Sequence, residues 1–355
     1  EKLRSFNFEQ GRYLADILLD GVIEPVPEGE HLIVVPDDVL GILPFEVLVL
    51  DGNGTVHTRR ARRSDQIMVS VSGVQFLGDR NTVSYWQSLT ARTNSKRYAG
   101  QGPNGGRTLV IADPVFGELD ERWRGSEQAT GGATRQVSTE ARSSRRPSLM
   151  GAPVDLICGP QPPTWIRLEE SDGLVQRLSW MYGPDADIRT GLAANKRDFL
   201  DNAACGLDGY AQLVFAGHGY FGNDLPGILE PVLVFSLMPP GTDGYLRMSE
   251  VTALEINADV VALAACRSGL GEHVAGEGVL GMGRAFQYAG AKSVLVSLWP
   301  VAVDSSVHLI ANFFAFRKGG RSKLDSLTRA RFLLRESGYD HPYFWASFIL
   351  VGEVE

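Results

Sequence analysis

The stretch Val260-Val-Ala-Leu-Ala-Ala-Cys-Arg-Ser-Gly-Leu-Gly271 decides the fold. It opens with a continuous apolar run that ends abruptly at Cys266, where a polar and glycine-containing segment begins. A short apolar run of this kind is typical of a strand buried on both faces, although a buried helix segment gives the same pattern. We interpret it as a strand of a parallel sheet with Cys266 at its carboxyl end.

A second run of the same kind, Ala211–Gly217, ends at His218. The chain between the two runs is long enough for the crossover connection that neighbouring parallel strands require. Ligands of open parallel sheets bind in the crevice outside the carboxyl ends of the strands, so both side chains would be directed to one place. A thiol and an imidazole at that place are the parts of a cysteine nucleophile and its base.

The composition is that of an ordinary folded protein. Of the 355 residues, 44% are hydrophobic and 21% are charged, which allows a large core and either two domains or one large duplicated domain. The net charge of −8 argues against a nucleic-acid-binding protein, although local basic patches remain compatible with it. The basic run His57–Arg63 is interpreted as a solvated strand edge or loop.

The cysteines, Cys158, Cys205 and Cys266, are few and widely spaced. They form no CxxC pair and have no histidine at metal-ligand spacing, so we expect no disulfide framework, no metal site, no cofactor and a reducing, cytoplasmic compartment. The sequence shows neither a signal peptide nor an apolar run of membrane-spanning length, which predicts a protein without membrane contact. The chain begins at Glu1 rather than at methionine, as expected of an excised domain or a processed product.

Strand-like and helix-like segments alternate along the chain, as in a mainly parallel α/β sheet. Between Gly117 and Pro163 the composition changes to Gly, Ser, Thr, Arg and Pro, which bury too little apolar area to offset the entropy of ordering. We expect residues 117–163 to form a mobile insertion between residues 1–116 and 164–355. The expected elements are helices at 6–19, 84–92, 195–204, 278–290, 304–316 and 323–337, strands at 31–35, 107–114, 291–299 and 345–352, and a hairpin turn at 51–54.

A cysteine nucleophile needs a base that takes up its proton and donors that stabilise the oxyanion. His218 is the candidate base, and the backbone N–H groups of Gly219 and Cys266 are the candidate oxyanion donors. The alternative is that Cys266 is an inert buried thiol and that His218 is a turn or core residue. The residues alone leave both interpretations open.

Other reactive groups have simpler explanations. Cys158 lies in the loop-like insertion, and Cys205 lies late in an expected helix. The glycine-rich Gly276–Gly283 lacks the lysine of a P-loop and the spacing of a dinucleotide site, so we do not interpret it as a phosphate site. His273 is close to Cys266 in sequence but, like the remaining histidines, is expected to be structural. These histidines are His31, His57, His273, His308 and His341.

A set of motifs follows in order along the chain, most densely in its second half. They are Leu40–Glu46, Ile111–Pro114, Phe215–Phe221, Leu263–Gly269, Gly276–Gly278, Arg284–Phe286, Ala289–Val294, Ser297–Val301 and His341–Phe348. Together they resemble the CHAT domain, a bacterial caspase- and separase-like cysteine protease module of clan CD. The resemblance implies a caspase-haemoglobinase-like fold, with a degenerate caspase-like unit in residues 1–116 and a catalytic unit in residues 164–355.

The resemblance also implies roles for individual residues. His218 and Cys266 correspond to the catalytic dyad, at a spacing close to the roughly 50 residues known for caspases. Ala264 stands where caspases have a glutamine that helps to bind aspartate, so strict aspartate specificity is not expected. Asp304, shortly after Trp299, lies in the region that lines the S1 pocket of separase-like relatives, where a carboxylate favours Arg or Lys at P1. Capping of the following helix is the alternative role of Asp304.

Relatives of this kind cleave a dedicated protein substrate in bacterial antiviral defence or regulated cell death, and they carry TPR or other sensor repeats. No 34-residue helical repeat is visible in this sequence, so a sensor domain or an activating partner protein is expected outside the chain. Residues 117–163 are then a candidate activation or self-cleavage loop. Two other functions remain open: a catalytically silent CHAT scaffold that binds partners, and a small-molecule thiol hydrolase or acyltransferase.

Overall fold

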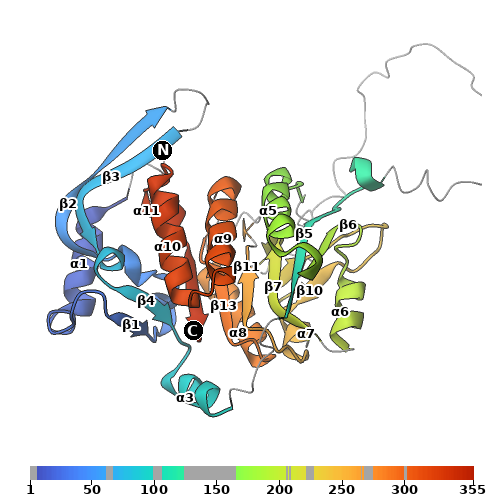
Figure 1. Ribbon diagram of the computed structural model, residues 1–355, viewed down its shortest axis with the longest axis horizontal. Helices are drawn as coiled ribbons and strands as arrows, with labels where there is room; N and C mark the ends of the chain where they lie inside the picture. Colours follow the sequence, from blue (N-terminus) through green and yellow to red (C-terminus); the bar gives the residue numbers. More distant parts are fainter. Residues whose placement is uncertain are drawn as a thin grey trace, which may run out of the picture.

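The computed structural model describes residues 6–60, 67–98, 106–123, 165–204, 207, 209–220, 228–264, 266–267, 275–299 and 302–355. In this part of the chain the strands form sheets of eight, four and two strands. Helices cover both faces of the eight-stranded sheet, and the two-stranded sheet projects at one end of the molecule (Figure 1). The expected α/β architecture, with a mainly parallel sheet flanked by helices, is confirmed.

The strands of the central sheet follow the order β1-β4-β14-β13-β11-β7-β5-β6. They are His31–Val34 (β1), Thr82–Tyr85 (β4), Arg107–Pro114 (β5), Ala186–Gly191 (β6), Tyr210–Ala216 (β7), Val260–Leu263 (β11), Ser293–Ser297 (β13) and Phe348–Gly352 (β14). The strands from β13 to β6 are parallel to one another, and β14, β4 and β1 form a second parallel group. The two groups meet antiparallel at β13 and β14. The carboxyl ends of β5, β6, β7, β11 and β13 therefore share one edge.

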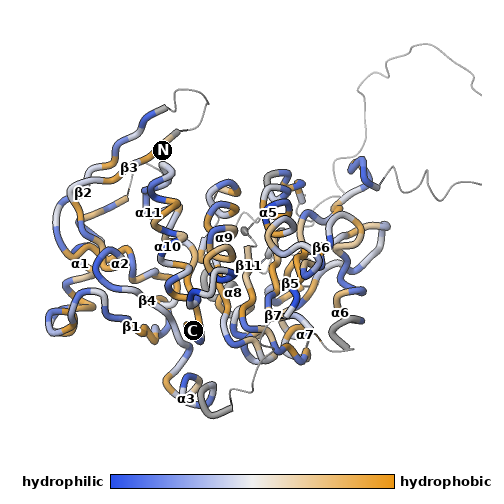
Figure 2. The backbone as a smooth tube through the Cα atoms, viewed as in Figure 1, coloured by the Kyte–Doolittle hydropathy of each residue, from blue (hydrophilic) through white to orange (hydrophobic). Residues whose placement is uncertain are grey.

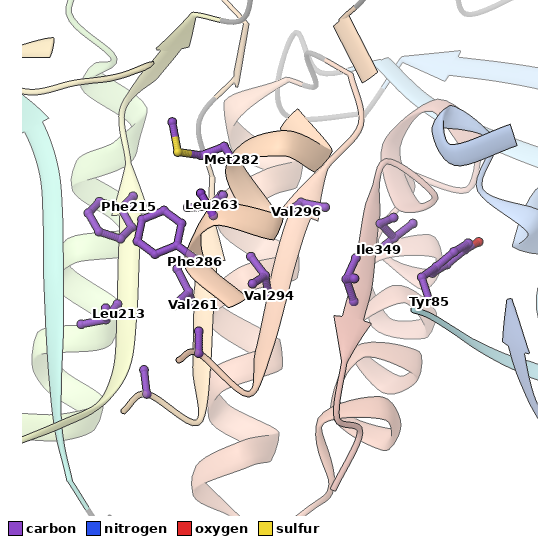
Figure 3. Packing of buried hydrophobic residues seen from close by; sticks show 14 of the residues in the cluster. Tyr85, Leu213, Phe215, Val261, Leu263, Met282, Phe286, Val294, Val296 and Ile349 are labelled. Carbon is purple, nitrogen blue, oxygen red and sulfur yellow. The ribbon is translucent and has the colours of Figure 1, made fainter. Parts of the chain in front are cut away.

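Alternate residues of the central strands face two separate apolar clusters. Val261 and Leu263 belong to one cluster, while Val260 and Ala262 belong to the other. In the first cluster Phe215 of β7 lies beside Phe286 of α8 (Ala275–Tyr288), with ring centroids 5.3 Å apart (Figure 3). Burial on both faces explains why the run is continuously apolar, and it decides between the strand and helix interpretations in favour of the strand.

Helices are divided between the two faces. The first cluster also includes residues of α1 (Phe8–Leu19), α6 (Lys196–Ala204) and α7 (Met248–Thr252), and the second includes residues of α5 (Asp172–Tyr182), α9 (Val303–Lys318), α10 (Lys323–Glu336) and α11 (Pro342–Trp345). The helix α10 begins after Ser322, whose hydroxyl accepts a hydrogen bond from the Asp325 N–H at 3.1 Å. Short helices connect the strands: α2 (Leu77–Arg80), α3 (Leu89–Tyr98), η2 (Asp38–Ile42), η3 (Phe45–Val47), η4 (Glu169–Ser171) and η5 (Gly183–Asp185).

The two-stranded sheet is a long hairpin of Val49–Arg60 (β2) and Ile67–Phe76 (β3). The turn expected at residues 51–54 is wrong, because these residues lie within β2. They coincide instead with two irregularities of the β2–β3 register. Gly52 has a φ of +85°, and a Cβ there would lie 2.2 Å from the Gly73 carbonyl oxygen, so the glycine serves a bulge. The outer end of β2 is exposed and hydrophilic (Figure 2), in line with the solvated strand edge or loop expected for His57–Arg63, of which residues 61–63 lie outside the described residues.

Two further segments differ from the sequence expectations. The expected helix over residues 84–92 is divided, because residues 84 and 85 complete β4 in the sheet and α3 begins only at Leu89. The last strand, expected from Trp345, begins only at Phe348, since Trp345 is the last residue of α11.

Residues 1–116 and residues 164–355 both contribute strands to the eight-stranded sheet. β5 comes before the expected insertion but lies between β6 and β7, which come after it. Residues 124–163 of the expected insertion lie outside the described residues. None of the helices within the described ranges combines the length and hydropathy that a membrane crossing requires.

Candidate active site

The strands that lead to His218 and Cys266 are neighbours. β7 and β11 pair in parallel, with Phe215 opposite Leu263. The segments that follow β7 and β11 contribute strands to the four-stranded sheet, whose order is β10-β9-β8-β12. Its strands are His218–Tyr220 (β8), Val232–Val234 (β9), Tyr245–Arg247 (β10) and Cys266–Arg267 (β12). In this sheet β8 and β12 run parallel, and Cys266 is the Cα partner of His218.

Cys266 begins a strand of its own instead of closing the apolar run, which differs from the sequence expectation. The Ala264 N–H still donates to the Phe215 carbonyl at 2.8 Å, after which the chain leaves the central sheet. Adjacent strands lie about 4.7–4.9 Å apart, so the paired backbones of His218 and Cys266 are next to each other.

The imidazole of His218 lies in an aromatic pocket and is only 4% exposed. Its ring centroid is 5.0 Å from that of Phe116 and 5.3 Å from that of Trp165. The Nε2 atom is 2.6 Å from the carbonyl oxygen of Ile166. The Nδ1 atom is buried and has no hydrogen-bond partner among the described residues.

These contacts assign the protons of the ring. A carbonyl oxygen only accepts hydrogen bonds, so Nε2 carries the hydrogen and donates it to Ile166. In the neutral imidazole Nδ1 is then the basic nitrogen. Burial lowers the pKa of His218 below its ordinary value of 6.5, and the hydrogen bond to Ile166 opposes this shift only in part. At neutral pH His218 is thus a neutral imidazole whose free nitrogen can accept a proton.

The pocket around His218 contains residues that sequence reasoning did not identify. Phe116 follows β5, and Trp165 and Ile166 lie just before η4. The Trp165 indole N–H donates to the Tyr245 hydroxyl at 3.2 Å, which fixes one end of this short segment. The contact of His218 with Ile166 uses a backbone oxygen, which every residue has, so no residue type in the sequence could have indicated it.

The expected oxyanion donors both lie in the four-stranded sheet. Gly219 pairs with Leu233 of β9 on one side and with Arg267 of β12 on the other. Cys266 belongs to β12, which is the last strand in the sheet order. The backbone N–H groups of Gly219 and Cys266 are therefore within one pair of adjacent strands.

One of the three expected S1 residues, Ala264, comes two positions before Cys266 of β12. Ala264, Ala216 and Val303 of α9 line one small cavity of about 20 Å³. Trp299 is partly buried, and its indole N–H donates to the Tyr343 carbonyl at 2.9 Å. The structure therefore brings Ala264 together with the beginning of α9.

Asp304, the third expected S1 residue, is exposed and lies in the first turn of α9. The N-cap residue of α9 is Ala302, so the alternative that Asp304 caps the helix is wrong. Burial and the Arg177 guanidinium lower the pKa of His308, one turn further along, and the Asp304 carboxylate opposes them.

The other reactive groups of the sequence are accounted for in different ways. Cys158, Cys205 and His273 lie outside the described residues. Gly276–Gly283 lies inside α8. Four histidines have a polar contact: His31 with Ser84, His57 with Ser72, His308 with Arg177 and His341 with the Tyr343 N–H. Within the described ranges, no group of three or more His, Cys, Asp or Glu residues is arranged to hold a metal ion.

Two curated mammalian proteins share a segment with this chain. Tetratricopeptide repeat protein 28 of Homo sapiens is 34% identical over 115 residues, which are 32% of this chain and 5% of that protein. The Mus musculus protein of the same name is 32% identical over 115 residues, with the same two shares. The matched segment is therefore a small part of each relative.

The chain also resembles two solved structures and matches one family model. The separase in the Saccharomyces cerevisiae separase–securin complex gives a TM-score of 0.41 at 14% identity, over 79% of this chain and 14% of that chain. The Arg-specific cysteine proteinase gingipain R gives 0.45 at 9% identity, over 77% and 54%. The family model of the CHAT domain matches residues 9–353. Because this match covers nearly the whole chain, and agrees with the motifs of the sequence, the chain belongs to the CHAT domain family.

Proposed function

We propose that the chain is a cysteine endopeptidase in which Cys266 is the nucleophile and His218 its base. One observation carries the proposal. His218 uses Nε2 for the Ile166 carbonyl, keeps Nδ1 free of described partners, and is the direct strand partner of Cys266. An imidazole held in this tautomer beside a cysteine is the arrangement that activates a thiol.

The reaction follows from these roles. Nδ1 of His218 takes the thiol proton of Cys266, and the thiolate attacks the carbonyl carbon of the scissile peptide bond. The N–H groups of Gly219 and Cys266 stabilise the oxyanion. The imidazolium returns its proton to the leaving amine, and a thioester remains on Cys266. A water molecule, deprotonated by His218, then hydrolyses the thioester and releases the free thiol.

We place substrate selection at the beginning of α9. The carboxylate of Asp304 is the proposed partner of an Arg or Lys side chain at P1, with Trp299 and Ala264 forming walls of the S1 pocket. The exposure of Asp304 and the cavity that Ala264 shares with residues of α9 support this placement. A charge-assisted pair of this kind favours a cationic side chain over a neutral one of the same length.

We further propose that the substrate is a dedicated protein and that a sensor outside this chain controls its cleavage. The family membership supports this, as does the similarity to mammalian proteins that are named for the tetratricopeptide repeat. A role in bacterial antiviral defence or regulated cell death, in the cytoplasm, rests on the resemblance of the motifs alone.

Mass spectrometry tests the proposed chemistry directly. The chain is incubated with an acyloxymethyl ketone peptide that ends in arginine, and the adduct is mapped. We expect one adduct, on Cys266, and none in Cys266→Ala. Cys158→Ala and Cys205→Ala are the matched controls, because each removes a thiol that has no proposed role and should leave the adduct unchanged.

The remaining outcomes separate the rival functions. Adducts only with peptides ending in Asp, Leu or Met would reject the basic P1 preference and keep the nucleophile. A chain that reacts with no peptide, alone or with a TPR protein added, would reject the endopeptidase and favour the silent scaffold. Turnover of small esters without cleavage of any peptide would favour the small-molecule hydrolase or acyltransferase.

A further inference from the structure

The carbonyl of Ile166 fixes the tautomer of His218, so whatever holds this carbonyl in place acts on the proposed base. Ile166 belongs to neither a helix nor a strand, and its own side chain is 72% exposed. The position of the carbonyl therefore depends on the neighbouring residues. Trp165 packs in a small apolar cluster on one side of it. On the other side Arg167 forms an ion pair.

Arg167 is bound by Asp113 at the end of β5. Its Nη2 lies 2.8 Å from Asp113 Oδ2, and its Nε donates at 3.0 Å to Oδ1. Two parallel hydrogen bonds from a guanidinium to a carboxylate fix orientation as well as distance. The hydrogen bond to Asp113 also raises the pKa of Arg167. The pairing therefore holds the backbone of Arg167 in place, and with it the carbonyl group of the preceding residue, Ile166.

Asp113 is itself rigidly placed. It is 3% exposed and has a φ of +45°, in the left-handed region. Arg122 donates to its carboxylate at 2.6 Å and to its backbone carbonyl at 2.9 Å. The neighbouring Ala112 pairs with Ala216 in β7, two residues before His218. Asp113 thus connects the strand that leads to His218 with the segment that binds His218 from the other side.

We infer that Asp113 is a positioning residue for His218, acting through Arg167 and the Ile166 carbonyl. The inference rests on the proposed function, since it assigns to Asp113 the orientation of the base. Within the described residues Asp113 makes no hydrogen bond to the imidazole; it determines where the Ile166 carbonyl, the acceptor of Nε2–H, stands. We call the ion pair between Asp113 and Arg167 the clamp. Without the clamp the ring hydrogen of His218 is free to occupy Nδ1, and the imidazole then presents no lone pair to the thiol.

The test compares Asp113→Asn and Arg167→Gln with Asp120→Asn. Asparagine tolerates the left-handed backbone of Asp113, so the first variant removes the charge without imposing strain. Asp120 binds Arg122 at 2.6 Å and belongs to the same cluster, but no hydrogen bond joins it to Arg167 in the described residues, which makes it the matched control. The Arg167 side chain is 37% exposed, so Arg167→Gln keeps the test informative if Asp113→Asn does not fold.

The decisive readout is the tautomer, measured by ¹⁵N NMR of the histidine rings at about pH 7.5, above the ordinary histidine pKa. Of the 6 histidines, His218 is identified by the signal that disappears in His218→Gln. We expect only the Nε2–H form in the wild type and in Asp120→Asn, and a mixture of forms in Asp113→Asn and Arg167→Gln. Arg167→Lys, which keeps the charge but not the paired donors, should be intermediate.

The kinetic readout uses as substrate a cleavable peptide amide with arginine at P1, in place of the acyloxymethyl ketone. We expect kcat to fall on the order of 10- to 100-fold in Asp113→Asn and Arg167→Gln, a part of what a general base contributes. KM should change less than about threefold, because substrate contacts are untouched.

Three results would overturn the inference: an unchanged tautomer in both variants, a fall in kcat without a change of tautomer, or an equal effect of Asp120→Asn. A wild type that holds the Nε2–H form but reacts with no peptide would refute the proposed function while leaving the clamp intact. The failures of the two proposals are therefore distinguishable.

Discussion

Glu46 and Arg331 form a buried ion pair, with 2.7 Å between Oε1 and Nη2 and side-chain exposures of 0% and 9%. Glu46 closes the motif Leu40–Glu46, and Arg331 belongs to α10, so the pair joins distant parts of the chain. The Tyr85 hydroxyl donates to Glu46 at 2.5 Å, and Arg331 donates to the Phe348 carbonyl. The pair therefore lies where β4 and β14, the strands that contain Tyr85 and Phe348, meet in the sheet.

Arg331→Met should strongly destabilise the fold, because it leaves the carboxylate of Glu46 buried without its cation. We expect a loss of about 3–5 kcal/mol in the free energy of unfolding, measured by urea denaturation. Arg329→Met is the control, since it removes an exposed pair with Asp325 and should cost less than about 1 kcal/mol. Equal losses in the two variants would show that the buried pair has no special weight.

The pH dependence of peptide hydrolysis should report His218. Its neutral form is the base, and burial lowers its pKa below 6.5, so activity should be retained at pH 6.5 and decline only at lower pH. The measurement is kcat/KM against pH. A decline with its midpoint above 6.5 would contradict the buried, neutral imidazole. His218→Gln should lower kcat on the order of 10²- to 10⁴-fold, the contribution of a general base.

Asp304→Asn should reduce the preference for arginine at P1. A hydrogen bond to a charged group contributes about 1.5–3 kcal/mol, so kcat/KM for an arginine peptide should fall on the order of 10- to 100-fold. The same peptide with methionine at P1 serves as the control and should be cleaved at an unchanged rate. A parallel fall for both peptides would place the effect of Asp304 outside the S1 pocket.

Two glycines that follow helices should differ in their tolerance of alanine. Gly290 follows α8 with a φ of +112°, and a Cβ there would lie 2.1 Å from the Ile256 carbonyl oxygen. Gly320 follows α9 with a φ of +84° and has no atom within 4 Å of that position. Gly320→Ala should therefore cost only the backbone term of about 1–2 kcal/mol. Gly290→Ala should cost about 1–3 kcal/mol more, as overpacking does; thermal unfolding of both variants measures the difference.

The strands beside the site could be predicted because each is buried on both faces. Val260–Leu263 alternates between two apolar clusters, which leaves a continuous apolar run in the sequence. His218 and Cys266 follow two such runs closely, as expected, but they begin strands of the four-stranded sheet, which the runs did not indicate. Local signals failed where tertiary structure decides the conformation. Gly52 and Gly54 indicated a turn, but they lie at irregularities of a long hairpin, whose strands pair from Val49 and Phe76 to Arg60 and Ile67.

The surroundings of His218 could not be predicted for a different reason. Its partner Ile166 is 52 positions away and contributes only a backbone oxygen. Asp113 was visible in the motif Ile111–Pro114, yet nothing local indicates that this carboxylate at a strand end would bind both Arg122, nine positions away, and Arg167, 54 positions away. Contacts of this kind depend on the assembled sheet.

The ion pairs of Asp113 also predict how the protein would behave after a single cleavage of its backbone. Arg122 and Arg167 stand on either side of residues 124–164, and both bind this one carboxylate. β5, on the amino-terminal side, is hydrogen-bonded between β6 and β7, on the carboxyl-terminal side. A single cut between Trp123 and Trp165 would thus yield two polypeptides that remain one particle, visible as two bands under denaturing conditions and as one species in native gel filtration.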